Sequence, residues 1–134
     1  MDIIKMAREL GHAIQEQDFY KNLYAAKDNA DKDEELQKLI EDFNIKRVAI
    51  NAEACKKERD EEKLSTLNAE MRTLYSQIMA NERMIAYNSA KTEFDHNMRR
   101  VNAIIANSSE GEDPDTTDYS DSCTHDCSTC GGCH

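Results

Sequence analysis

The chain has 134 residues, which suits a single domain, and 33% of them are charged whereas 39% are hydrophobic. It holds no Trp and one Pro, and this profile favours long helices over sheets. Residues 108–134 carry seven acids and no base within a net charge of −10, so we expect no direct binding to nucleic acid and a basic protein surface as the more natural partner.

The start of the chain shows no basic region followed by an apolar run, so we expect no secretory signal. No stretch approaches the 18 apolar residues of a membrane span, so no membrane association is expected. Cysteines in a chain without an export signal are expected to be reduced, which favours metal or redox chemistry over structural disulfides. We therefore place the protein in the cytoplasm.

Hydrophobic residues at helical spacing predict four or five helices within residues 1–107. The first begins at Asp2 as its N-cap, and the second begins at Asp18 as its cap and ends at a polar connection over residues 27–33. The third runs from the cap Asp33 to about Arg59. A fourth follows a charged turn, and Asn81 marks the break before the fifth.

The third predicted helix carries apolar residues on two sides. One stripe holds Leu36, Leu39, Ile40, Phe43, Ile50 and Ala54, and the other holds Ile45, Val48, Ala49, Ala52 and Cys55. Such a helix needs neighbours on two sides, and at roughly 40 Å it is longer than a domain of this size covers by itself. Cys55 is interpreted as a packing residue. We expect a homo-oligomer, a dimer or higher.

The predicted fold class is all-α: an antiparallel bundle of four to five helices with long central helices, dimeric, followed by a disordered Cys-rich C-terminal tail. Residues 1–107 form the helical domain. Residues 108–122 form an acidic flexible linker, and residues 123–134 form the tail.

The tail concentrates the chemistry of the chain. Its spacing is C-x3-C-x2-C-x2-C, with two histidines interleaved, and its candidate ligands are Cys123, Cys127, Cys130 and Cys133, with His125 and His134 as further candidates. Four thiolates, or three and one imidazole, suit zinc, but zinc ribbons separate their ligand pairs by a dozen or more residues. Tight cysteine runs are closer to iron–sulfur spacing. Thiol redox chemistry and an exposed tail without chemistry are the alternatives.

Enzyme motifs are absent from the sequence: there is no glycine-rich phosphate loop, no nucleophile elbow and no HExxH pair. We therefore predict a non-catalytic protein. The residues alone leave open a regulatory adaptor, a zinc or copper handling or structural metal-binding protein, and a purely structural helical oligomer.

Three stretches resemble the YlbF/YmcA family over residues 2–107. They are Ile3-Ile4-Lys5-x-Ala7-Arg8-Glu9-Leu10; Phe19-Tyr20 with Asp33-Glu34-Glu35-Leu36-Gln37-Lys38-Leu39-Ile40-x-x-Phe43; and Tyr87-x-x-Ala90-x-x-x-Phe94 with Val101-Asn102-x-Ile104-Ile105. The Cys- and Gly-containing tail is similar to the YlbF branch.

The resemblance implies a small, self-associating all-α protein that joins YmcA-like and YaaT-like partners in a complex carrying iron–sulfur clusters. Such a complex regulates RNase Y in mRNA processing and affects competence, sporulation and biofilm formation. By this resemblance Cys123, Cys127, Cys130 and Cys133 hold the cluster, expected to be 4Fe–4S and shared with a partner, with zinc as the alternative.

Overall fold

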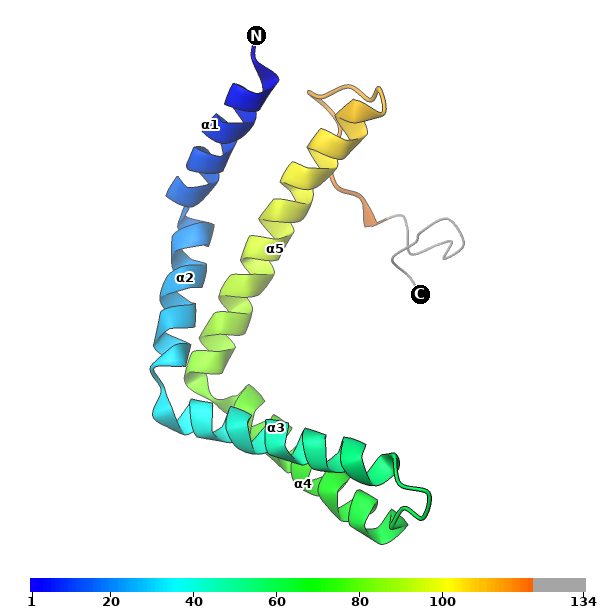
Figure 1. Cartoon of the computed structure of the whole chain (residues 1–134). Helices are drawn as coiled ribbons and strands as arrows, with labels where there is room; N and C mark the ends of the chain where they lie inside the picture. Colours follow the sequence, from blue (N-terminus) through cyan, green and yellow to red (C-terminus); the bar gives the residue numbers. More distant parts are fainter. Residues whose placement is uncertain (122–134) are drawn as a thin grey trace. The chain divides into compact units, whose positions relative to one another are not determined.

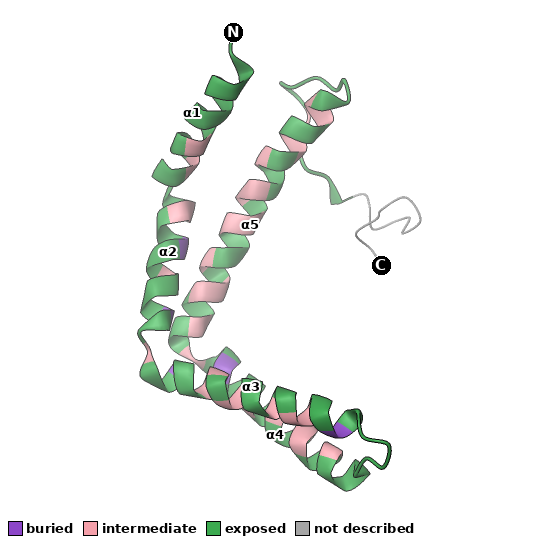
Figure 2. Cartoon of the chain, viewed as in Figure 1, coloured by how far each residue is buried: buried purple, intermediate pink, exposed green. Residues whose placement is uncertain are grey.

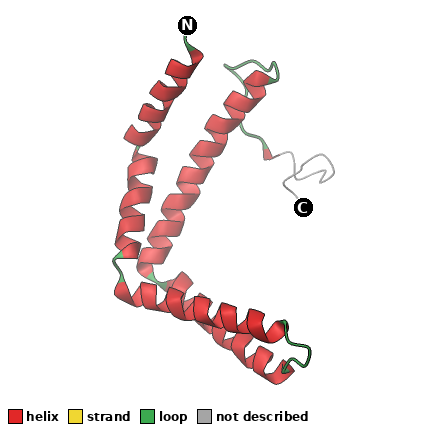
Figure 3. Cartoon of the chain, in the orientation of Figure 1, coloured by secondary structure: helices red, strands yellow, loops and turns green. Residues whose placement is uncertain are grey.

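The computed structural model describes residues 1–121, and these form five helices and no strand (Figure 3). The helices are α1 (Ile3–Glu16), α2 (Asp18–Asp31), α3 (Glu34–Ala54), α4 (Glu61–Ala80) and α5 (Glu82–Ser109). The predicted all-α class is therefore confirmed. The chain divides into two units, residues 1–92 and the residues from Glu93 onward, and each is described by itself.

Aspartate carboxylates begin three of the helices. Asp2 Oδ1 accepts the backbone N–H of Ile4 at 3.0 Å, and Asp33 Oδ1 accepts that of Leu36 at 3.1 Å. Asp60, before α4, accepts the N–H of Lys63 at 3.1 Å. Each bond satisfies a donor that the first helical turn leaves without a partner. The caps predicted at Asp2 and Asp33 are confirmed.

Two predicted helix boundaries are wrong. The N-cap of α2 is Gln17, which makes no side-chain capping bond, and Asp18 lies inside the helix. The polar stretch read as a connection is helical to Asp31, because Ala30 is buried there and Lys32 pairs with Asp28 one turn earlier at 2.8 Å.

The third helix is also shorter than predicted, since α3 ends at Ala54 instead of near Arg59. The polar residues after it form a turn that returns the chain into α4. Tertiary contacts of that turn, described below, stop the helix at a point that the sequence pattern does not mark.

The α3–α4 hairpin holds most of the packing in the first unit. The two helices run antiparallel and side by side (Figure 1). The buried cluster of the unit joins this hairpin to α2 and to the start of α5: it consists of Ala30, Leu36 and Ile78, against which Leu39, Ile40, Phe43 and Met84 pack. Lys46 forms an ion pair with Glu70 across the helices. The first apolar stripe predicted for the third helix therefore packs in this cluster, beside α4.

The buried interior of the described chain is small. Its buried hydrophobic residues are Leu23, Ala30, Leu36 and Ile78, and most of the chain in Figure 2 is coloured as exposed or intermediate. α1 contains no buried residue. No helix among residues 1–121 is long and apolar enough to span a bilayer.

Candidate functional site

The predicted metal ligands Cys123, His125, Cys127, Cys130, Cys133 and His134 lie outside the described residues. Their assignment as ligands stays a prediction that rests on donor chemistry. Four thiolates within eleven residues form a soft donor set that fits an iron–sulfur cluster or zinc.

Residues 1–121 hold no group of three or more His, Cys, Asp or Glu side chains arranged to bind a metal ion. The fifth cysteine, Cys55, is the C-cap residue of α3 and is exposed, so its interpretation as a packing residue is wrong for the described chain. It lies at the end of the second apolar stripe of α3, which is also exposed.

A buried carboxylate closes the tip of the hairpin. Glu53 is 4% exposed, and its Oε1 accepts the backbone N–H of Asp60 at 2.9 Å. Its Oε2 lies 2.7 Å from Lys56 Nζ and 3.7 Å from Lys63 Nζ. The Lys56 ammonium, together with the Asp60 N–H, holds the pKa of Glu53 below its ordinary value. A carboxylate so fully paired serves as a structural link between α3 and α4, and it offers no open proton-transfer site.

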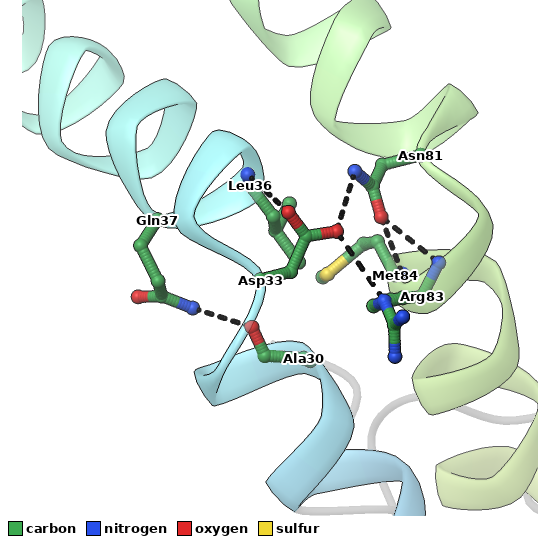
Figure 4. A network of polar contacts seen from close by, with 7 residues as sticks. All are labelled: Ala30, Asp33, Leu36, Gln37, Asn81, Arg83 and Met84. Carbon is green, nitrogen blue, oxygen red and sulfur yellow. Dashed lines mark hydrogen bonds and ion pairs between the residues drawn. The ribbon is translucent and has the colours of Figure 1, made fainter.

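A second polar network joins the two ends of the hairpin (Figure 4). Asn81 Nδ2 donates to Asp33 Oδ2 at 3.3 Å, and Arg83 Nε lies 3.7 Å from the same oxygen. Asn81 Oδ1 accepts the backbone N–H groups of Arg83 and Met84 at 2.9 and 3.1 Å, which caps the first turn of α5. The pKa of Asp33 is lowered, and the largest cause is the hydrogen bond that its carboxylate accepts from the Leu36 N–H. The predicted break and cap at Asn81 are confirmed.

In the second unit, the segment after α5 folds back onto that helix. Arg100 and Asp118 form a two-pronged ion pair with Arg100 Nη2 2.8 Å from Asp118 Oδ2, and Asn107 Nδ2 donates to Thr117 Oγ1 at 2.9 Å. The guanidinium lowers the pKa of Asp118. The ion pair thus links α5 to the segment that precedes the cysteine tail in the sequence.

The outer face of α3 exposes large apolar side chains. Ile45 and Val48 are 57% and 63% exposed, and with Ala52 and Cys55 they form a row that we call the outer stripe. A shallow groove beside it is lined by Gln37, Ile40, Glu41, Asn44, Ile45 and Val48. Of the second apolar side predicted for the third helix, Ala49 is half-buried and the other four residues are exposed; Ile45 also lines a groove with Leu74 of α4.

Sequence reasoning missed Glu53 and the Arg100–Asp118 pair. The signal for Glu53 was an acid inside an apolar stripe with a lysine three residues later, a spacing that allows a local ion pair. Nothing local marks the pairing of Arg100 with Asp118, because it depends on the chain reversing after Gly111, whose φ of 98° is the left-handed conformation that favours glycine.

Comparisons with known proteins match the helical part of the chain. Residues 3–108 match the family model described as control of competence regulator ComK, YlbF/YmcA. The chain is similar to a UPF0342 protein of Caldicellulosiruptor bescii, with 30% identity over 112 residues, which are 84% of this chain and 92% of that protein. No solved structure matches.

Proposed function

The chain belongs to the YlbF/YmcA family, whose description is one of competence control, and from this we propose that it is a non-catalytic regulatory adaptor of the cytoplasm. The observation that carries the proposal is the family match over residues 3–108 followed by a tail with four cysteines. The helical body supplies protein-contact surfaces, and the tail supplies ligands for a metal centre.

In the finer form of the proposal, the chain self-associates and joins YmcA-like and YaaT-like proteins in a complex that modulates RNase Y-dependent mRNA processing. Cys123, Cys127, Cys130 and Cys133 contribute to an iron–sulfur cluster, proposed as 4Fe–4S and shared with a partner. The exposed apolar face of α3 and the acidic stretch before the tail support a role in protein contact.

The test is metal and sulfide analysis on the full chain, purified without oxygen both alone and with the partners that copurify. We expect iron and sulfide in wild type, and their loss when the four tail cysteines are replaced by serine. Far-UV circular dichroism of the same variant should be unchanged, since all five helices of the described residues lie at or before Ser109 and contain none of the four substituted cysteines. Unfolding of that variant would contradict the separation of body and tail.

A zinc or copper handling role is the second candidate, and the same thiolate donor set favours it. Zinc at about one ion per chain, with no sulfide and no colour, would replace the cluster proposal by this one. If neither metal is present and deletion of residues 108–134 leaves the cellular phenotype unchanged, a purely structural helical oligomer is the better description.

A further inference from the structure

An exposed tyrosine and two arginines lie near one another on the α3–α4 hairpin. The rings of Phe43 and Tyr75 have centroids 6.3 Å apart across the two helices. On α3, Arg47 follows Phe43 by four residues. On α4, Arg72 precedes Tyr75 by three, and both intervals place the two side chains on one face of their helix. Because the helices are antiparallel, both arginines lie about one turn from the ring pair in the direction of the hairpin tip. We call Phe43, Arg47, Arg72 and Tyr75 the arginine–tyrosine patch.

The patch is open to solvent in the first unit. Tyr75 is 54% exposed, and Arg47 and Arg72 are exposed as well, whereas Phe43 is half-buried. Tyrosine and arginine are among the side chains that carry most of the binding energy at protein interfaces. The composition of the patch is therefore that of a contact surface.

The two guanidinium groups of the patch have no acid partner in the part of the chain that the structure describes. Arg59 of the same hairpin pairs with Glu61 at 2.7 Å. In contrast, Arg47 and Arg72 form no ion pair and no side-chain hydrogen bond with another of residues 1–121. The chain has 27 acids and 17 bases, so two neighbouring arginines without a counter-charge are not what its composition predicts.

Helix geometry keeps the acids of α3 and α4 away from the patch. At about 100° per residue, every acid of α3 lies roughly 120° or more around the axis from Arg47. These acids are Glu34, Glu35, Glu41, Asp42 and Glu53. On α4, Glu70 lies roughly 160° around the axis from Arg72. Glu61 and Glu62 lie about 15 Å nearer the tip than Arg72. The patch is thus a cationic area, free of acids from its own helices, in a chain of net charge −10.

An acidic peptide segment is the occupant that this chemistry fits. The planar guanidinium binds a carboxylate by two parallel hydrogen bonds, and it loses its hydration more readily than an ammonium does. The Tyr75 ring offers apolar area beside the two cations, and its hydroxyl offers a hydrogen bond. Phosphates of nucleic acid also attract arginine, but their binding strengthens with the number of cations that neutralise them. Two arginines in a chain of net charge −10 suit a short acidic peptide instead.

We propose that the arginine–tyrosine patch binds an acidic segment of a partner protein. Arg47 and Arg72 each pair with a carboxylate of that segment, and Tyr75 packs against one of its apolar side chains. The inference rests on the adaptor role in the proposed function, and it names the surface and the charge of the partner segment.

The first experiment is photo-crosslinking in cells that contain the full chain and its natural partners. Benzoylphenylalanine replaces Tyr75 or, as a matched control, Tyr24, an exposed tyrosine of α2 that is 49% exposed. Mass spectrometry identifies the crosslinked segment. We expect position 75 to capture a segment of another protein in which acids outnumber bases, and position 24 not to capture it. A segment without an excess of acids, a segment of this chain itself, an RNA, no crosslink at position 75, or equal capture at position 24 would overturn the proposal.

The second experiment asks whether the two arginines carry the binding. A labelled synthetic peptide of the crosslinked segment is titrated with full-chain wild type, Arg47→Glu, Arg72→Glu and the matched control Lys38→Glu, and fluorescence anisotropy measures its affinity. Lys38 is exposed on α3 roughly 180° around the axis from Arg47, so its substitution makes the same charge change away from the patch. We expect each arginine variant to bind about tenfold more weakly and the control to bind as wild type does. Where circular dichroism shows that a glutamate variant has lost its helices, Arg47→Gln with Arg72→Gln takes its place.

The two ways in which the inference can fail are distinguishable. Equal affinity in the arginine variants and the control would overturn the role of the patch and leave the adaptor role in place, because the partner would then dock elsewhere. A wild-type chain that copurifies with no partner protein would instead contradict the proposed function, and the inference would fall with it.

Discussion

Replacing Leu36 by alanine tests whether the small core holds the first unit together. Leu36 is the fully buried side chain of the cluster, at 0% exposure, with Ala30 and Ile78 beside it. Removing its buried methyl groups loses the transfer free energy and leaves a cavity, and buried Leu→Ala changes of this kind cost about 2–5 kcal/mol. We expect Leu36→Ala to lower the free energy of unfolding by about 3 kcal/mol, within this range, because the structure has few other buried residues.

The loss is large compared with a typical stability of about 5–15 kcal/mol, so the variant should fold and melt early. For a domain of this size, we expect a midpoint lower by roughly 10–20 °C. Thermal denaturation followed by circular dichroism at fixed protein concentration measures it. Ile85→Ala, at a position 53% exposed, is the control and should change stability by less than about 0.5 kcal/mol. A Leu36→Ala cost as small as that of the control would refute the reasoning.

Three further predictions concern polar contacts. Glu53→Gln should lower the melting temperature at neutral pH. Because the fold lowers the pKa of Glu53, the stability that the ionised carboxylate contributes is lost as the pH falls through that pKa. The melting temperatures of variant and wild type should therefore converge in acid. A constant difference at all pH values would contradict this. Asn81→Ala removes the cap of α5 and should cost about 1 kcal/mol in chemical denaturation, with Asn81→Ser expected to retain more of the capping without placing a second carboxylate beside Asp33. Asp118→Asn should speed hydrogen exchange after α5 without moving the midpoint of helix melting, since its ion pair with Arg100 is partly exposed. Equal exchange rates in variant and wild type would show that the ion pair does not hold the segment.

Local signals predicted the helices well because they act over a few residues. The carboxylates of Asp2 and Asp33 sit directly before apolar repeats, and each caps its helix as expected. The prediction of a connection over residues 27–33 was wrong because the polar composition gives no sign that Ala30 is buried, which depends on tertiary packing. The predicted end of α3 was wrong for a similar reason, since Glu53 is bound by groups from the turn and from α4.

Contacts between distant residues were beyond reach of the sequence pattern. Asp33 and Asn81 were each identified as caps, but their mutual hydrogen bond spans 48 residues and depends on how the hairpin closes. The tail shows the reverse case. Its donor types and spacing predict soft-metal chemistry, and both that chemistry and the ligand set stay predictions because the described residues end at 121.

The Asp33–Asn81 bond also means that the hairpin leaves and re-enters the rest of the first unit at a single point. A segment whose two ends meet can change length without displacing what flanks it. Adding seven residues, about two turns, to both α3 and α4 keeps their faces in register. The length of the hairpin is therefore independent of the rest of the first unit, and whole heptads inserted before the tip that Glu53 closes would change only how far the tip extends.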